Sequence, residues 1–267
     1  DIDAAVKDLV QSAFGHAGQK CSAASLAIVE KTIYDNPAFV RQLKDAVETL
    51  QVGAGWDYGT VVGPVIHPPE GPLMRAPDFE TAIAWQNAVD YGLTAGVHAL
   101  DVEECEMWID RIQAGNVYVN RGTTGAIVNR QPFGGWKRSA VGPTSKAGGP
   151  HYVTQLRDWL PVDDVARSMQ QAELWWSHVG SRRIDNAGLR VERNVFRYLP
   201  HHLGIDVRIS EHTTKESLQY LETIGRLTGT EMRLSSATAI PGVKCSVQSL
   251  EEFTAKAAGE RVRVLSG

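Results

Sequence analysis

The second half of the chain alternates short apolar runs with segments of helical periodicity. Strands that alternate with helices form a parallel sheet whose faces the helices cover. Residues 162–267 are therefore predicted to form an α/β domain. No Gly-x-Gly-x-x-Gly run follows its strands, which argues against dinucleotide binding there. The predicted strands span residues 194–199, 205–209, 231–234 and 261–265, and the predicted helices span residues 215–227 and 250–258.

Residues 1–161 mix the same element types and end at Pro161, where we place a domain boundary. Asn36, Asp78 and Asp101 each precede a helical pattern and are predicted to be N-caps, because their side chains can accept a helix N–H. The glycine-rich stretch at residues 122–150 has the length of a functional loop. Strands are predicted at residues 26–29, 94–100, 116–120 and 152–160.

Composition excludes several classes of protein. The chain has 267 residues, is 43% hydrophobic and has a net charge of −4, which favours neither nucleic acid nor an anionic membrane as a partner. No apolar stretch is long enough to cross a bilayer. Three widely spaced cysteines predict a reducing, cytoplasmic location without disulfides. His16 and His201 lack metal-ligand spacing, so no metal is expected.

Residues 14–23 (Phe-Gly-His-Ala-Gly-Gln-Lys-Cys-Ser-Ala) contain the most informative pattern. Cys21 follows Gly18 by three residues, and we expect it near the start of a short helix. A helix N-terminus and the neighbouring Lys20 would both favour the reactive thiolate. The alternative is that Cys21 is a small buried apolar residue, as lone helical cysteines usually are.

Five ordered motifs resemble those of aldehyde dehydrogenases. Lys before the cysteine and Ser after it resemble the glutamate-semialdehyde members, and the last motif resembles the proline-catabolic branch of the proline utilisation A type. The motifs are residues 18–23 (Gly-Gln-Lys-Cys-Ser-Ala), 91–98 (Tyr-Gly-Leu-Thr-Ala-Gly-Val-His), 115–120 (Gly-Asn-Val-Tyr-Val-Asn), 131–135 (Gln-Pro-Phe-Gly-Gly) and 146–152 (Lys-Ala-Gly-Gly-Pro-His-Tyr).

The resemblance implies an aldehyde dehydrogenase catalytic domain with Cys21 as its nucleophile. The thiolate would attack the aldehyde of L-glutamate γ-semialdehyde, hydride would leave to NAD+, and water would hydrolyse the thioester to release glutamate. Covalent catalysis of this kind divides one difficult oxidation into easier steps. A small-molecule aldehyde is then the expected partner, and the full-length parent is expected to be a homo-oligomer.

The resemblance also implies a set of substrate-binding residues. Lys20 and Ser22 would line the pocket, and Ser22 would help to bind the substrate α-carboxylate. Backbone N–H groups of Gly125 and Ala126 would hold the same carboxylate, as donors in a glycine-rich loop can. Phe133 would pack against the aliphatic part of the substrate. From the residues alone, this loop could equally be a surface turn and Phe133 a core aromatic.

Several parts of the family have no counterpart in this sequence. The NAD-binding domain, with the general-base Glu and the oxyanion-hole Asn, would precede Asp1, so we expect a piece of a longer protein that is inactive alone. Cofactor-binding residues remain unassigned. The connection near residues 69–76 is shorter than the family requires and lacks its Glu-Phe-Gly-Pro segment. NAD is expected in the parent, and FAD would belong to a separate upstream proline dehydrogenase module.

Residues 192–194 (Glu-Arg-Asn) and the α/β pattern after them resemble the C-terminal domain of longer proline utilisation A proteins. That resemblance implies a partial Rossmann-like domain that covers the active site without binding NAD. Three alternatives stay open: an aldehyde dehydrogenase for another substrate, a cysteine hydrolase with an unidentified His base, and a non-catalytic packing or oligomerisation fragment.

Overall fold

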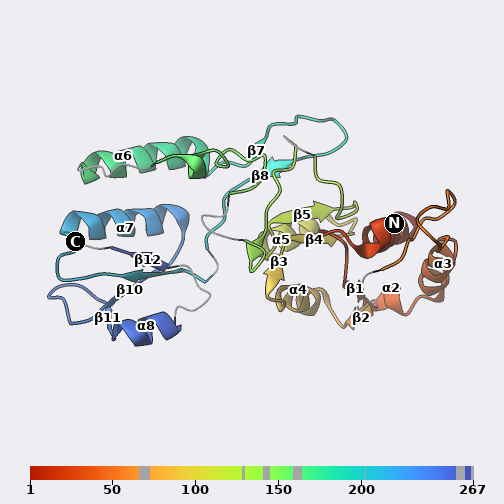
Figure 1. Cartoon of the computed structure of the whole chain (residues 1–267), viewed down its shortest axis with the longest axis horizontal. Helices are drawn as coiled ribbons and strands as arrows, with labels where there is room; N and C mark the ends of the chain where they lie inside the picture. The colour runs from red at the N-terminus through yellow and green to blue at the C-terminus, as the bar shows by residue number, and fades with distance from the viewer. Residues whose placement is uncertain are drawn as a thin grey trace. The chain divides into compact units, whose positions relative to one another are not determined.

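A computed structural model describes residues 1–65, 73–127, 130–140, 145–158, 164–201, 203–256 and 262–265 (Figure 1). It divides the chain into two compact units, which we call unit 1 (Asp1–Arg157) and unit 2 (Asp158–Gly267). Both units mix helices and strands, so the α/β class is confirmed. The boundary expected near Pro161 lies outside the described residues, and domains 1–161 and 162–267 stay predictions.

In unit 1 the three predicted N-caps each begin a helix. Asn36, Asp78 and Asp101 each accept a hydrogen bond from a backbone N–H in the first turn that follows. The elements are α1 (Ile2–Phe14), η1 (Gly15–Gly18), β1 (Ala27–Glu30), α2 (Lys31–Tyr34), α3 (Pro37–Glu48), β2 (Leu73–Ala76), α4 (Phe79–Asn87), β3 (Tyr91–Gly92), β4 (Thr94–Val97), α5 (Val102–Arg111), β5 (Asn116–Val119), β6 (Trp136–Lys137) and η2 (Thr154–Leu156).

The strands of unit 1 form short pairs with separate cores. β1 pairs with β2 and β4 with β5, both in parallel, and β3 pairs with β6 antiparallel. One core, around β4 and α5, consists of Ile83, Ala95, Trp108 and Ile112. A second core joins α1 and α3 through Val6, Val10 and Phe39. The second core anchors α1, the helix that leads into the Cys21 segment.

Unit 2 contains a parallel sheet, as predicted, but the strand expected at residues 194–199 is not part of it. Only Val195–Phe196 of that stretch forms a strand, and it pairs antiparallel with Ile184–Asp185. The strand order of the parallel sheet is β11-β10-β9-β12 with every neighbour parallel, and α7 and α8 cover opposite faces (Figure 1). The two-residue strand β11 is absent from the sequence prediction. The elements are α6 (Val165–Trp175), the π-helical turn η3 (Trp176–Gly180), β7 (Ile184–Asp185), β8 (Val195–Phe196), β9 (Ile205–Arg208), α7 (Lys215–Thr228), β10 (Met232–Ser236), β11 (Ser246–Val247), α8 (Leu250–Lys256) and β12 (Val262–Val264).

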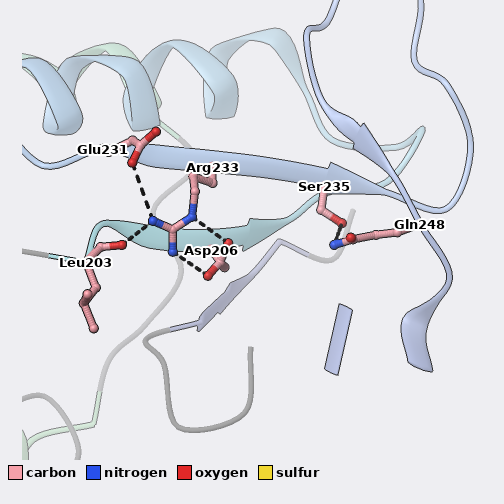
Figure 2. A network of polar contacts seen from close by, with 6 residues as sticks. All are labelled: Leu203, Asp206, Glu231, Arg233, Ser235 and Gln248. Carbon is pink, nitrogen blue, oxygen red and sulfur yellow. Dashed lines mark hydrogen bonds and ion pairs between the residues drawn. The ribbon is translucent and has the colours of Figure 1, made fainter. Parts of the chain in front are cut away.

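An ion pair joins the two inner strands of this sheet (Figure 2). Arg233 on β10 lies opposite Asp206 on β9 and donates two hydrogen bonds to its carboxylate, at 2.9 and 2.7 Å. The guanidinium also bonds to the Leu203 carbonyl and lies 3.5 Å from Glu231. Asp206 is buried, so its charge depends on this partner.

The strand expected at residues 152–160 is wrong within the described residues. Tyr152 and Val153 lie in a turn that leads into η2. The Thr154 hydroxyl donates to the His151 carbonyl at 2.6 Å, and the Ser145 hydroxyl donates to the same oxygen at 3.2 Å. Side-chain hydroxyls that bond to the backbone compete with strand pairing, and here they stabilise a turn. None of the helices in the described ranges is long and apolar enough to span a membrane.

Candidate functional site

Cys21 lies in a turn between η1 and β1, and the expectation that it starts a helix is wrong. His16 and Ala17 have φ of 55° and 57°, and Gly18 continues in this left-handed region at 70°. This reversal ends the helical path and turns the chain back along α1, where the Ala24 N–H donates to the Ser12 carbonyl at 3.0 Å. The Ala23 N–H closes the turn on the Lys20 carbonyl, also at 3.0 Å.

The three neighbours in this turn differ in exposure. Lys20 and Cys21 are exposed, which excludes the alternative that Cys21 is a buried apolar residue in this chain. Ser22 is only 5% exposed. None of the described residues forms a hydrogen bond with the Ser22 hydroxyl, whose bonding capacity is therefore open to a ligand.

The loop after β5 is tied to this turn by Thr123. The Thr123 hydroxyl donates to the Ser22 carbonyl at 3.1 Å, and the Thr123 N–H donates to the Ser12 hydroxyl at 3.1 Å. Gly125, with φ of 87°, and Ala126 follow two and three residues later and are exposed. The structure thus joins the cysteine turn to the glycine loop through Thr123 and Ser12, two residues that the sequence motifs did not single out.

Phe133 is partly buried and belongs to neither of the two buried cores. Its backbone forms two hydrogen bonds with Ala147, at 3.0 and 2.8 Å. The Asn116 side chain accepts from the Gly134 N–H at 3.1 Å and donates to the Pro132 carbonyl at 3.0 Å. These contacts fix the backbone on both sides of Phe133. Within the described ranges no hydrogen bond joins Phe133 to Cys21.

Lys146 is a further residue that sequence reasoning left without a role. Its ammonium donates to the Gly134 carbonyl at 2.7 Å, to Asn116 Oδ1 at 3.2 Å and to the Gly115 carbonyl. Burial lowers the pKa of Lys146 to about 8. The only sequence signal was its place at the start of the Lys-Ala-Gly-Gly-Pro-His-Tyr motif.

The other two cysteines are less accessible than Cys21. Cys105 and Cys245 are only partly exposed. Burial raises the pKa of the Cys105 thiol, and the carboxylates of Glu104, Asp101 and Glu106 raise it further. Thiolates are the reactive form of cysteine, so Cys105 should react slowly.

We therefore expect Cys21 to be the first of the three cysteines that iodoacetamide alkylates in the folded protein. Peptide mapping of a time course measures the three rates separately, and the unfolded protein in denaturant provides the control in which the rates converge. Faster alkylation of Cys105 or Cys245 than of Cys21 in the folded chain would contradict the assignment of an accessible nucleophile.

The described residues contain no group of three His, Cys, Asp or Glu side chains that could hold a metal ion. The turn between β9 and α7 carries Glu211 and His212 where a dinucleotide fold has glycines. A carboxylate in that turn repels a pyrophosphate, so this edge of unit 2 does not fit NAD.

Known proteins resemble a little more than half of this chain in sequence. The aldehyde dehydrogenase family matches residues 1–72 and 69–159. A 1-pyrroline-5-carboxylate dehydrogenase from Geobacillus is 32% identical over 207 residues, covering 57% of this chain and 39% of the relative. The corresponding protein of Bacillus thuringiensis is 34% identical over 205 residues, with the same coverage. The chain thus spans about two fifths of the length of these relatives.

Solved structures give the same result. Proline utilization A from Corynebacterium freiburgense matches all of this chain with a TM-score of 0.79 and 32% identity, and 35% of that protein is covered. The 1-pyrroline-5-carboxylate dehydrogenase from Thermus, solved with bound NAD, matches 58% of the chain with a TM-score of 0.52 and 28% identity, and 39% of that protein is covered.

The alignments also indicate that this chain lacks a segment that its relatives have. The alignment with the Geobacillus relative extends over 207 positions but takes up only 57% of this 267-residue sequence. The family match itself breaks into two stretches at residues 69–72. Both observations agree with the short connection that the sequence predicted at residues 69–76. Because the family match covers more than half of its length, the chain belongs to the aldehyde dehydrogenase family.

Proposed function

We propose that this chain supplies the nucleophile and the substrate pocket of an enzyme that oxidises L-glutamate γ-semialdehyde to L-glutamate in proline catabolism. The observation that carries the proposal is the pairing of an exposed Cys21 with a buried Ser22 whose hydroxyl no described residue uses. The names of the relatives, 1-pyrroline-5-carboxylate dehydrogenase and proline utilization A, support the same substrate class.

The chemistry that this chain can perform begins at the Cys21 thiolate. Its sulfur forms a bond to the aldehyde carbon, the C=O π electrons move onto the oxygen, and that oxygen takes up a proton to give a thiohemiacetal. The exposed turn gives an aldehyde access to the sulfur. NAD+, held elsewhere in the complete enzyme, supplies a hydride acceptor.

Recognition of the α-carboxylate is assigned to the groups around Cys21. The Ser22 hydroxyl and the N–H groups of Gly125 and Ala126 can donate to a carboxylate, and none of them bonds to a described residue. Lys20 is exposed and adds a positive charge next to Cys21. Phe133 would pack against the aliphatic part of the aldehyde. An aldehyde that lacks a carboxylate would leave these donors without a partner.

Other properties of the complete enzyme follow the same proposal. Residues 1–161 would be the catalytic domain and residues 162–267 a C-terminal lid-like domain. The enzyme would be a cytoplasmic homo-oligomer, and FAD would belong to a separate proline dehydrogenase module. The two-unit division and the complete match to a proline utilization A structure support this organisation.

The substrate proposal predicts that glutamate semialdehyde protects Cys21 from iodoacetamide, because thiohemiacetal formation removes the thiol. The semialdehyde should protect at a lower concentration than propionaldehyde. A hydrogen bond to a charged group contributes about 1.5–3 kcal/mol, so Ser22→Ala should weaken protection by the semialdehyde about ten-fold to a hundred-fold. Protection by propionaldehyde should change little. Peptide mapping of alkylated Cys21 measures both.

Ser25→Ala is the matched control, since Ser25 lies in the same segment and is exposed. It should behave as the unsubstituted chain. Equal losses with both aldehydes in Ser22→Ala would show that Ser22 only supports the turn. Better protection by propionaldehyde in the unsubstituted chain would instead favour an aldehyde dehydrogenase for another substrate.

A further inference from the structure

Lys146 places an amine inside unit 1, between the start of β5 and the loop that carries Phe133. Its Nζ donates to the carbonyl oxygens of Gly115 and Gly134 and to Asn116 Oδ1. A lysine ammonium has three N–H bonds, and these acceptors use all of them. Lys146 therefore has no donor left for the carboxylate or the aldehyde oxygen of a substrate.

The acceptors of the Lys146 ammonium lie close together because the backbones of Gly115 and Gly134 approach each other closely. A Cβ atom on Gly115 would lie 1.9 Å from the Gly134 carbonyl oxygen, so no other residue fits at this position without displacing the loop. The next residue after Lys146, Ala147, forms both of its backbone hydrogen bonds with Phe133. Lys146 and Ala147 thus fix the backbone of two neighbouring residues, Gly134 and Phe133.

We propose that Lys146 is a positioning residue of the aldehyde pocket, which fixes the Gly134 backbone and thereby the place of the Phe133 ring. The inference rests on the function proposed above, since Phe133 contacts substrate only in that assignment. It gives a role to a partly buried amine that neither the nucleophile nor the carboxylate donors require.

Protonation gives this role a measurable signature. Burial lowers the pKa of Lys146 to about 8, and no charged side chain among the described residues contributes to the shift. Above that pH the neutral amine donates at most two hydrogen bonds, so one of the three acceptors loses its donor. The Gly134 N–H bonds to Asn116 Oδ1, an acceptor that Lys146 also uses. The environment of the Gly134 N–H should therefore change as Lys146 titrates.

The first experiment follows the Gly134 amide by ¹H–¹⁵N NMR while the pH is raised through the value of about 8 at which Lys146 deprotonates. The resonance should titrate in the unsubstituted chain and should stop doing so in Lys146→Met. Lys137→Met is the matched control, because Lys137 is another partly buried lysine whose ammonium donates to backbone carbonyls, those of Asn87 and Val89. In that variant the titration of Gly134 should persist.

The second experiment measures protection of Cys21 by glutamate semialdehyde in the same variants. Lys146→Met removes all three hydrogen bonds of the ammonium, but it acts on the substrate only through the placement of Phe133, for which we expect roughly a two-fold to ten-fold change. Lys146→Met should weaken protection by about that factor, Lys146→Arg should restore part of it, and Lys137→Met should leave it unchanged.

The outcomes separate this inference from the proposed function. If glutamate semialdehyde protects no better than propionaldehyde in the unsubstituted chain, the proposed function fails, whatever the Gly134 amide does. If it protects well and Lys146→Met protects equally well, the positioning role is overturned. A Gly134 resonance that titrates equally in Lys146→Met and in the unsubstituted chain also overturns it.

Discussion

Trp108→Ala should lower the free energy of unfolding of unit 1 by about 3–5 kcal/mol, the range found when a large buried aromatic is truncated. Trp108 is 2% exposed and packs against Ile83, Ala95 and Ile112. Its indole N–H donates to the Gln86 side chain at 2.9 Å, so the substitution also removes a hydrogen bond. Urea denaturation followed by far-ultraviolet circular dichroism measures the loss.

Trp56→Ala is the control for this core prediction. Trp56 is 84% exposed, so its removal should change the free energy of unfolding by less than about 0.5 kcal/mol. A loss in Trp108→Ala no greater than that in Trp56→Ala would mean that the β4–α5 core does not hold unit 1 together in solution.

Arg233→Met should destabilise unit 2 by roughly 3 kcal/mol, because it leaves the buried Asp206 carboxylate without its partner. Arg226→Met provides a matched comparison. Arg226 pairs with Glu173 at 2.9 Å, but both side chains are more than half exposed. Exposed pairs contribute about 0–1 kcal/mol, so this variant should be nearly as stable as the unsubstituted chain.

Acidification provides a second test of the Asp206 pair. The hydrogen bonds and charge of Arg233 hold the pKa of Asp206 below its ordinary value. A carboxyl with a lower pKa in the folded state stabilises the fold above its unfolded pKa, and this contribution is lost as the pH falls towards the folded pKa. The difference in stability between the unsubstituted chain and Arg233→Met should therefore shrink in acid. A difference that is independent of pH would assign the loss to packing.

Local chemistry explains which parts of the fold were predictable. The N-caps Asn36, Asp78 and Asp101 act within one helical turn, so the sequence alone indicates where their helices begin. The strand β11 was missed because Ser246 and Val247 are exposed and pair with β10 only through the tertiary structure. A run of two residues carries no periodicity from which a strand could be inferred.

In the candidate site, too, features set by neighbouring residues were easier to predict than features set by the tertiary structure. Motif resemblance suggested roles for Cys21, Ser22 and the Gly125 loop, and these roles stay predictions, whereas the short helix expected to begin near Cys21 is wrong. The error arose because His16 and Ala17 adopt positive φ, a conformation that residues other than glycine seldom take. Lys146 was overlooked as a site residue because its acceptors at Gly115 and Gly134 converge only after folding.

The strand order of unit 2 has a consequence for synthesis on the ribosome. β9 is the first strand of the sheet to be translated, yet its partner on one side, β12, is the last. Until residues Val262–Val264 leave the exit tunnel, the nascent chain holds β9 with one edge unpaired. An open edge can recruit strands from other chains, so a pause in translation before β12 should promote aggregation.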